Sequence, residues 1–255
     1  MPASPTVPPI SHRPGNSDDH MNVIEAPKRK VKWDSDASQA MAQMLTDKAK
    51  QEMATVQAKL GCQNNVSDIC SPPRGAEMAR SLGMKAGVSL DLTVPASDGY
   101  IWDFSTKSCK DRCRENIHEQ KPLFLMLSPE RTPYSTIQNL NMRTPEGKAK
   151  VELARRKGDA HLKSCVTLAK AHMEGGKYFV YEHPKLAASW QNRDIVEPIS
   201  MAGMMQTELD QCEVGLTFKH KDGIAPAKKP TTLLTNSVEV DRIMSRRCRG
   251  GNRHV

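Results

Sequence analysis

The sequence lacks long apolar runs and has few aromatic residues. Its 255 residues are 38% hydrophobic and only 4% aromatic. A membrane-spanning helix needs about 20 consecutive apolar residues, and no stretch of the sequence approaches that length. Residues 1–19 contain no apolar segment between a basic start and a small-residue cleavage site, which argues against a secretory signal. We therefore expect a protein that is neither in a membrane nor secreted, located in the nucleus or the cytoplasm.

The cysteines are also uninformative as a disulfide pattern. There are seven of them, an odd number, and they are scattered without paired spacing. This usage favours a reducing compartment over a disulfide framework.

The net charge of +8 favours an acidic partner such as nucleic acid, but an excess of this size does not establish one. We expect a monomer.

Composition and periodicity divide the chain into three parts. Residues 1–38 are rich in Pro, Ser, Asn and Asp and have no regular apolar period, so we expect a disordered basic tail. Its basic run, residues 28–32, fits a nuclear import signal or a nucleic-acid anchor, and equally a solvated charged tail. Residues 39–61 are rich in helix formers with apolar residues at helical spacing, which predicts one amphipathic helix. Residues 62–255 form the third part.

In this third part, short apolar runs alternate with helical segments. The expected strands are 66–70, 89–92, 100–103, 122–127, 177–181, 208–212 and 231–235. The expected helices are 77–82, 107–119, 148–174 and 184–190. Continuous apolar strands separated by helices are typical of α/β proteins, with a mostly parallel, twisted sheet covered by helices on both faces.

Polar residues follow several of these strands. Ligands of open parallel sheets bind beyond the carboxyl ends of the strands, so these positions are the first candidates for a site. Residues 71–75 open a helix whose amides can face an anion. Asp91 lies about 20 residues beyond Asp68, the spacing at which an acid binds a ribose hydroxyl, although a turn aspartate is the alternative. Later strand ends carry Asp103, Ser128, Pro129, Glu182 and His183.

Nine segments, taken in their order, resemble the cytosine carbon-5 DNA methyltransferases. These belong to the class I S-adenosylmethionine-dependent methyltransferases, and the resemblance is to the divergent domains of retroelement and other mobile-element polyproteins. The segments are residues 70–74, 90–93, 102–104, 127–129 with 134–135, 138–141, 181–184, 210–212, 228–231 and 235–237. The resemblance implies a Rossmann-like fold, S-adenosylmethionine as the cofactor and DNA as the partner.

The resemblance also implies roles for the residues at the strand ends. Asp68 and the following loop would flank the methionine part of the cofactor. Asp91 would hold the ribose hydroxyls and Asp103 the adenine edge. Glu182 would match the glutamate that hydrogen-bonds the target cytosine and helps to activate its ring. The cofactor-binding residues implied in this way are Asp68, Ser71, Pro72, Asp91, Asp103, Ser128 and Pro129.

Arg131 occupies the position of the family's nucleophilic cysteine. The family reaction needs a thiolate that attacks the cytosine ring. A guanidinium stays protonated because its pKa exceeds about 12, so Arg131 cannot replace the thiolate. Cys165 and Cys212 lie outside this loop. The resemblance therefore implies a degenerate, inactive domain. An active methyltransferase with another nucleophile or acceptor, and a binding module without activity, are the alternatives.

Two further departures concern the cofactor and the DNA. The glycine-rich first loop of the family is missing, which lowers the affinity expected for the cofactor. Only residues 215–227 are available where the family inserts a target-recognition domain, so we do not expect sequence-specific base contacts of the family type.

Two weaker patterns complete the sequence. The segment 148–174 is basic and can contact phosphates, although a solvated helix face explains it equally well. The residues expected to contact nucleic acid are Lys148, Lys150, Arg155, Arg156 and Lys157. Cys109 and Cys113 have a spacing found in zinc sites, with His118 nearby and Cys248 and His254 near the last residue. These pairs do not complete one another, so we expect no metal.

Overall fold

The structure is a computed structural model that describes residues 35–220 and 223–250. Most of the predicted tail, including the basic run 28–32, lies outside the described residues. The helix predicted at 39–61 is present as α1 (Ser35–Lys59), and Met53 and Val56 on it are half-buried. The fold described below belongs to the compact unit of residues 46–255. No helix in the described ranges is long and apolar enough to cross a membrane.

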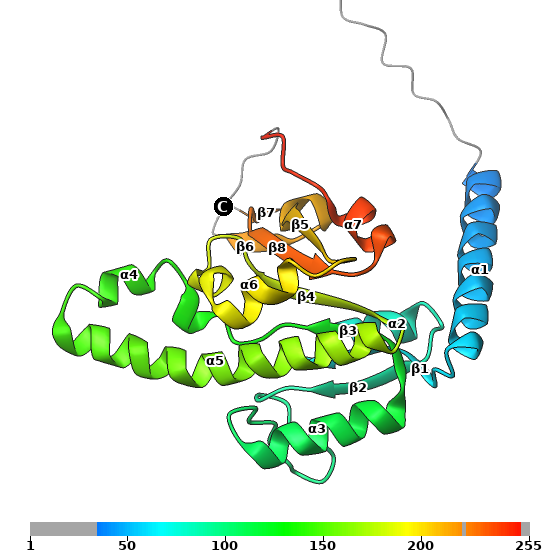
Figure 1. Cartoon of the computed structure of the whole chain (residues 1–255). Helices are drawn as coiled ribbons and strands as arrows, with labels where there is room; N and C mark the ends of the chain where they lie inside the picture. The colour runs from blue at the N-terminus through cyan, green and yellow to red at the C-terminus, as the bar shows by residue number, and fades with distance from the viewer. Residues whose placement is uncertain (1–34, 221–222, 251–255) are drawn as a thin grey trace, which may run out of the picture. The chain divides into compact units, whose positions relative to one another are not determined.

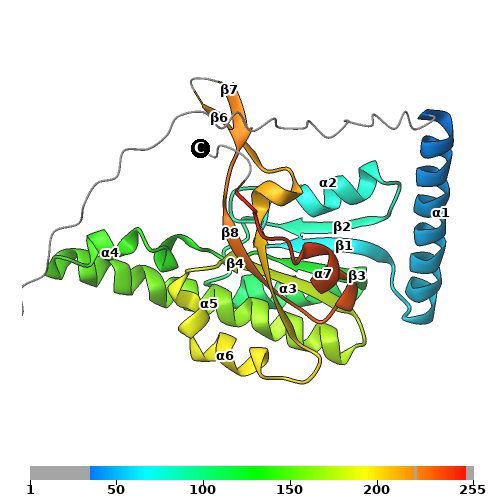
Figure 2. The same ribbon diagram turned by 90° about the horizontal axis from the view of Figure 1, so that it is seen from above.

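Six strands form one mixed sheet in the order β2-β1-β3-β4-β8-β5 (Figure 1, and from above in Figure 2). They are β1 (Asn64–Ile69), β2 (Ala86–Leu90), β3 (Pro122–Leu127), β4 (Tyr178–Pro184), β5 (Met205–Asp210) and β8 (Pro230–Thr235). Strands β2, β1, β3 and β4 are parallel, whereas β8 runs antiparallel to both β4 and β5. The predicted class, an α/β protein with a mostly parallel sheet, is confirmed.

Helices lie on both faces of this sheet (Figure 1). Those on one face are α3 (Lys107–Gln120), α5 (Pro145–Glu174) and α6 (Arg193–Ile199). Those on the other face are α2 (Arg74–Ser81) and α7 (Val238–Met244). Side chains of β3 alternate between the two faces of the sheet. Leu125 packs in the larger of two hydrophobic clusters, which includes residues of α5, whereas Phe124 packs in the smaller cluster with residues of α7. The period of two along the strand thus supplies both hydrophobic layers.

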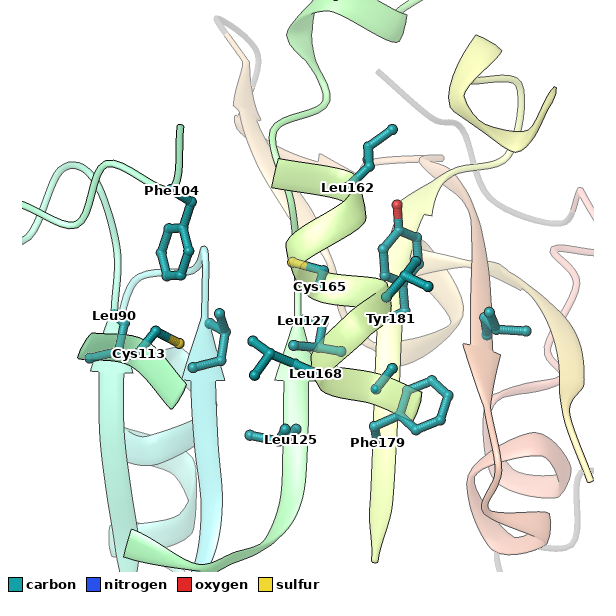
Figure 3. Packing of buried hydrophobic residues seen from close by; sticks show 14 of the residues in the cluster. Leu90, Phe104, Cys113, Leu125, Leu127, Leu162, Cys165, Leu168, Phe179 and Tyr181 are labelled. Carbon is teal, nitrogen blue, oxygen red and sulfur yellow. The ribbon is translucent and has the colours of Figure 1, made fainter. Parts of the chain in front are cut away.

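The larger core fixes the position of α5 on the sheet. Figure 3 shows Leu125, Leu127 and Phe179 of the strands packed with Cys165 and Leu168 of the helix. Each fully buried side chain of this size contributes about 1.5–3 kcal/mol. The helix begins at Thr144, whose hydroxyl accepts a hydrogen bond from the Gly147 N–H at 3.1 Å. It ends at Gly175, as the glycine pair predicts.

Some predicted elements differ from the structure. Residues 100–103 do not form a strand, because the Trp102 ring turns into the core between Tyr100 and Phe104 rather than extending along the sheet edge. The prediction of a helix at 184–190 is wrong as well. Strand β4 continues to Pro184 through its pairing with β8, and only a 3-10 turn, Ala188–Gln191, follows. The second strand ends at Leu90, so Asp91 stands just beyond it.

Several short elements carry too little pattern to be predicted. The region 215–227 forms a two-stranded hairpin, β6 (Thr217–His220) and β7 (Gly223–Pro226), and no separate domain. The remaining additions are η1 (Thr132–Tyr134), α4 (Gln138–Asn141), η3 (Gln211–Val214) and the helices α6 and α7. The hairpin agrees with the expectation that this region is too short for a target-recognition domain.

Candidate functional site

The candidate site lies where the strand order of the sheet reverses. The chain passes from β1 to β2 on one side and then returns to β3 on the other side of β1. The crevice outside the carboxyl ends of β1 and β3 is therefore the switch point at which open α/β sheets bind ligands. The Ser128 N–H donates to the Ile69 carbonyl at 3.0 Å and holds these two strand ends together. Ser128 lines two pockets, which we name after Asp91 and Glu182.

The Asp91 pocket combines aromatic walls with a few polar groups. It has a volume of about 250 Å³. Its residues are Cys70, Asp91, Leu92, Thr93, Trp102, Phe104, Ser128, Glu130 and His161. The Trp102 and Phe104 rings are stacked with centroids 6.5 Å apart, and His161 meets Phe104 edge-on at 6.2 Å. The buried Nε1 of Trp102 has no hydrogen-bond partner within the described residues. This mixture of rings and convergent polar groups is typical of a small-molecule site.

Asp91 is held in place through one of its two carboxylate oxygens. The side chain is only 8% exposed. Its Oδ1 accepts hydrogen bonds from the backbone N–H of Thr93 at 2.9 Å and from the Thr93 hydroxyl. No described residue donates a hydrogen bond to Oδ2. The turn therefore fixes the carboxylate and leaves one oxygen for a ligand.

Asp103 lies beside this pocket, between Trp102 and Phe104, and is not part of its lining. Its Oδ1 accepts from the Ser105 N–H at 2.9 Å, and the hydrogen bonds from Ser105 lower the pKa of the carboxyl. The Nε2 of His161 is 3.9 Å from the same Oδ1, and burial lowers the pKa of that imidazole. The sequence predicts no pocket role for His161, because the pattern of the 148–174 segment is dominated by its basic residues.

Cys70 closes the Asp91 pocket from the end of β1. Its backbone is left-handed, with φ at 57°, a conformation that favours glycine. Its Sγ lies 3.9 Å from the Sγ of Cys165, and this contact together with burial raises the pKa of the Cys70 thiol. The Cys70 side chain therefore forms part of the wall of this pocket.

The carboxylate of Asp68 is hydrogen-bonded by other groups of the protein. Its Oδ2 accepts from the Ala76 N–H at 2.8 Å and from the Ser89 hydroxyl at 3.1 Å. Burial raises the pKa of this carboxyl, and the hydrogen bonds oppose that shift. Asp68 and Ser71 line the Glu182 pocket, whereas Pro72 and Pro129 belong to neither lining. Of the seven residues expected to bind a cofactor, the Asp91 pocket brings together Asp91 and Ser128.

The Glu182 pocket has a volume of about 400 Å³ and a mostly apolar wall. Glu182 projects from β4, with its Oε1 3.4 Å from the Lys229 ammonium and 3.4 Å from the Gln211 amide. Burial lowers the pKa of Lys229, as do the charges of Arg131 and Arg74, while Glu182 raises it. Glu182 is therefore paired within the protein and surrounded by positive charge.

Arg131 is exposed and immediately precedes η1. The loop around it is held by buried groups. The His183 Nε2 lies 3.4 Å from the Glu130 carbonyl, and the Tyr134 hydroxyl donates to Asp159 at 2.7 Å. Neither alternative thiol reaches this loop, since Cys165 lies beside Cys70 and Cys212 follows β5. The part of the chain that the structure describes thus offers no thiol at the nucleophile position.

The basic residues of α5 do not form one stripe. At 3.6 residues per turn, Lys148 and Arg155 fall on one side of the helix, and Lys150 and Lys157 on the opposite side. Arg155 is half-buried and its Nε donates to the Pro133 carbonyl at 3.1 Å. Arg155 therefore also holds the loop that contains Arg131. Contact of Lys148, Lys150, Arg155, Arg156 and Lys157 with nucleic acid stays a prediction.

The thiols of α3 belong to the hydrophobic core. Cys109 and Cys113 are 0% exposed, whereas His118 is exposed on another face of the helix. Burial raises the pKa of Cys109 to about 11. These three side chains do not converge on one point. His254, the remaining residue of the zinc pattern, lies outside the described residues.

No protein-family model and no curated protein matches this sequence. Among solved structures, the chain is similar to a crystal structure of S. pombe Dnmt2 methyltransferase, with a TM-score of 0.41 and 11% sequence identity. The similarity covers 73% of this chain and 56% of that chain, so this protein spans little more than half of the methyltransferase. The similarity concerns the arrangement of the chain, and no activity follows from it.

Proposed function

We propose that this protein binds S-adenosylmethionine in the Asp91 pocket and does not transfer its methyl group to cytosine through a thiolate. One observation carries the proposal. A fixed carboxylate with one open oxygen faces a pocket with aromatic walls at the switch point of the sheet. The carboxylate suits the ribose hydroxyls of a nucleoside, and the flat rings suit its base.

The residues present fit the nucleoside part of this cofactor. The volume of about 250 Å³ is just below the range of roughly 300–1,000 Å³ typical of ligand pockets. Because Ser128 lines both pockets, the methionine part would extend from the first pocket toward the second. When bound, the cofactor supplies an electrophilic methyl group. Asp91 would accept the ribose hydrogen bonds, Trp102 and Phe104 would pack on the adenine, and Asp103 would face its edge.

The absence of cytosine transfer rests on the Arg131 loop. A permanently charged guanidinium has no lone pair with which to attack the ring. The Glu182 carboxylate, which would contact the base, is paired with Lys229 and Gln211. A degenerate relation to mobile-element methyltransferases and a DNA partner belong to the same proposal, and the order of the nine segments and the net charge of +8 support them.

Two measurements test the proposal. Isothermal titration of the purified chain with S-adenosylmethionine and S-adenosylhomocysteine should give saturable binding at one site. Incubation with the radiolabelled cofactor and mixed DNA should leave the DNA unlabelled. A titration without heat of binding would refute binding of the cofactor. Clear incorporation of labelled methyl groups into DNA would refute the proposed lack of methyl transfer.

A pair of variants isolates the nucleophile. Arg131→Cys restores a thiol to the loop, whereas the matched Arg131→Ser removes the same charge without adding one. If only the nucleophile was lost, Arg131→Cys should label DNA above the background of Arg131→Ser. Equal counts would show that further parts of the machinery, such as the paired Glu182, are also lost.

A further inference from the structure

The end of β5 is tied to a segment near residue 248. The Asp210 N–H donates to the Arg246 carbonyl at 2.9 Å. The Asp210 Oδ2 accepts from the Cys248 N–H at 2.9 Å and from the Arg247 Nε at 3.2 Å. These three bonds come from one residue that is 1% exposed, so they place residues 246–248 firmly beside η3.

This connection brings three potential metal ligands together. The thiols of Cys212 and Cys248 and a carboxylate oxygen of Glu213 all lie within 4.8 Å of one another. In a tetrahedral zinc site with Zn–S bonds of about 2.3 Å, two sulfur ligands are about 3.8 Å apart. Small side-chain rotations therefore suffice to bring the three atoms onto one ion. Within the described residues, no other group of three such side chains meets this distance.

A second observation points to a cation at this place. The Asp210 Oδ1 is buried and has no hydrogen-bond partner in the described part of the chain. The other oxygen of the same carboxylate, Oδ2, accepts from the Cys248 N–H, so the carboxylate lies beside the thiol cluster. A buried carboxylate oxygen without a partner is costly unless a positive charge lies near it. Arg247 already supplies one positive charge through Oδ2, and an ion between the thiols would add a second.

We propose that Cys212, Cys248 and Glu213 bind one zinc ion, with water in the fourth position. Two thiolates and one carboxylate form a ligand set that selects zinc over magnesium or calcium, which prefer oxygen ligands. Binding forms two Zn–S bonds and one Zn–O bond and releases the two thiol protons to solvent. Arg247, which pairs with Asp210 and Glu208, offsets part of the negative charge of these carboxylates and of the three ligands.

The ion would stabilise the neighbourhood of the Glu182 pocket. Gln211, directly before Cys212, donates to Thr231 at 2.9 Å and lies 3.4 Å from Glu182. Binding of the ion by Cys212 and Glu213, which lie within η3, would therefore also fix Gln211 at the start of η3. This role does not depend on binding of S-adenosylmethionine at the Asp91 pocket.

Metal titration of the reduced full chain tests the site. Zinc alone, measured by competition with a chromophoric chelator, should bind at one ion per chain and release two protons to the buffer. Cobalt in its place should show the absorption band of thiolate-to-cobalt charge transfer. Cys212→Ser and Cys248→Ser should each abolish this band, and Glu213→Gln should weaken binding. The matched controls Cys62→Ser and Glu197→Gln, at cysteine and glutamate positions outside the cluster, should bind as the wild type does.

Several outcomes would overturn the proposal. The proposal is wrong if the reduced wild-type chain binds neither zinc nor cobalt. It is also wrong if binding survives both Cys212→Ser and Cys248→Ser. Loss of binding only in variants of Cys70 or Cys165 would move the site to the other thiol pair. Circular dichroism of each variant separates lost ligands from lost folding, and a folded Cys212→Ser chain that keeps the cobalt band refutes the assignment.

Discussion

Replacing Asp91 by Asn gives the most direct test of the ligand pocket. The substitution keeps the shape of the side chain and an oxygen that can accept from Thr93, so the turn at 91–93 is preserved. It removes the negative charge from the oxygen that no described residue contacts. We therefore expect the free energy of unfolding to change little and the affinity for S-adenosylhomocysteine to fall.

The size of the effect follows from the type of hydrogen bond. A bond to a charged group contributes about 1.5–3 kcal/mol. At about 1.4 kcal/mol per tenfold change, Asp91→Asn should raise the Kd by roughly 10- to 140-fold. Isothermal titration of the wild type, Asp91→Asn and the control Asp111→Asn measures this change. Asp111 lies on the surface of α3, where it pairs with Lys107 and Arg114, and it is not part of the pocket lining.

An analogue without ribose hydroxyls completes a thermodynamic cycle. The wild type should prefer the normal nucleoside to the analogue, whereas Asp91→Asn should lose most of that preference, because the two changes remove the same contact. Equal affinities of Asp91→Asn and the wild type would refute the role of Asp91. An equal loss in Asp111→Asn would attribute the effect to general electrostatics.

Three further predictions concern stability, each measured by urea unfolding. A Cβ at Gly87 would overlap with the unpartnered Ser67 hydroxyl, so Gly87→Ala should cost about 1–3 kcal/mol and Ser67→Ala should restore part of it. Tyr134→Phe removes the donor to Asp159 and should cost about 1.5–3 kcal/mol. Burial lowers the pKa of His172 to about 4, below its unfolded value. Its contribution is therefore complete above about pH 6.5 and lost as the pH falls toward 4, and His172→Gln should flatten stability over that interval.

The long elements were predictable because their signals are local. Helix α5 has a capping threonine before it, a proline as its first residue and a glycine pair after it, and β3 is a continuous apolar run. The 100–103 segment has the composition of a strand but packs as a loop. The Tyr100 and Trp102 rings contact each other, and Trp102 stacks on Phe104, which contacts His161 of α5. This tertiary packing overrides the strand preference.

The site was predictable only in part. The rule that ligands bind beyond the strand ends names Asp91 and Ser128, and these two residues line one pocket because the carboxyl ends of neighbouring parallel strands meet. It missed His161, which reaches the pocket from the middle of α5, because helix residues carry no such positional rule. It also missed the proximity of Cys212 and Cys248. They are 36 residues apart, and only the antiparallel β5–β8 pairing and the bonds of Asp210 bring them together.

The two pockets at the switch point differ in how their polar groups are satisfied, and this difference favours binding without transfer. In the Glu182 pocket, Lys229 and Gln211 contact Glu182, and Ala76 and Ser89 contact Asp68. A base entering there would have to displace contacts that the protein already makes. In the Asp91 pocket, the open carboxylate oxygen and the Trp102 Nε1 lack such contacts among the described residues. A ligand in the Glu182 pocket can form hydrogen bonds only by breaking existing ones, whereas a ligand in the Asp91 pocket can form them without breaking any within the protein.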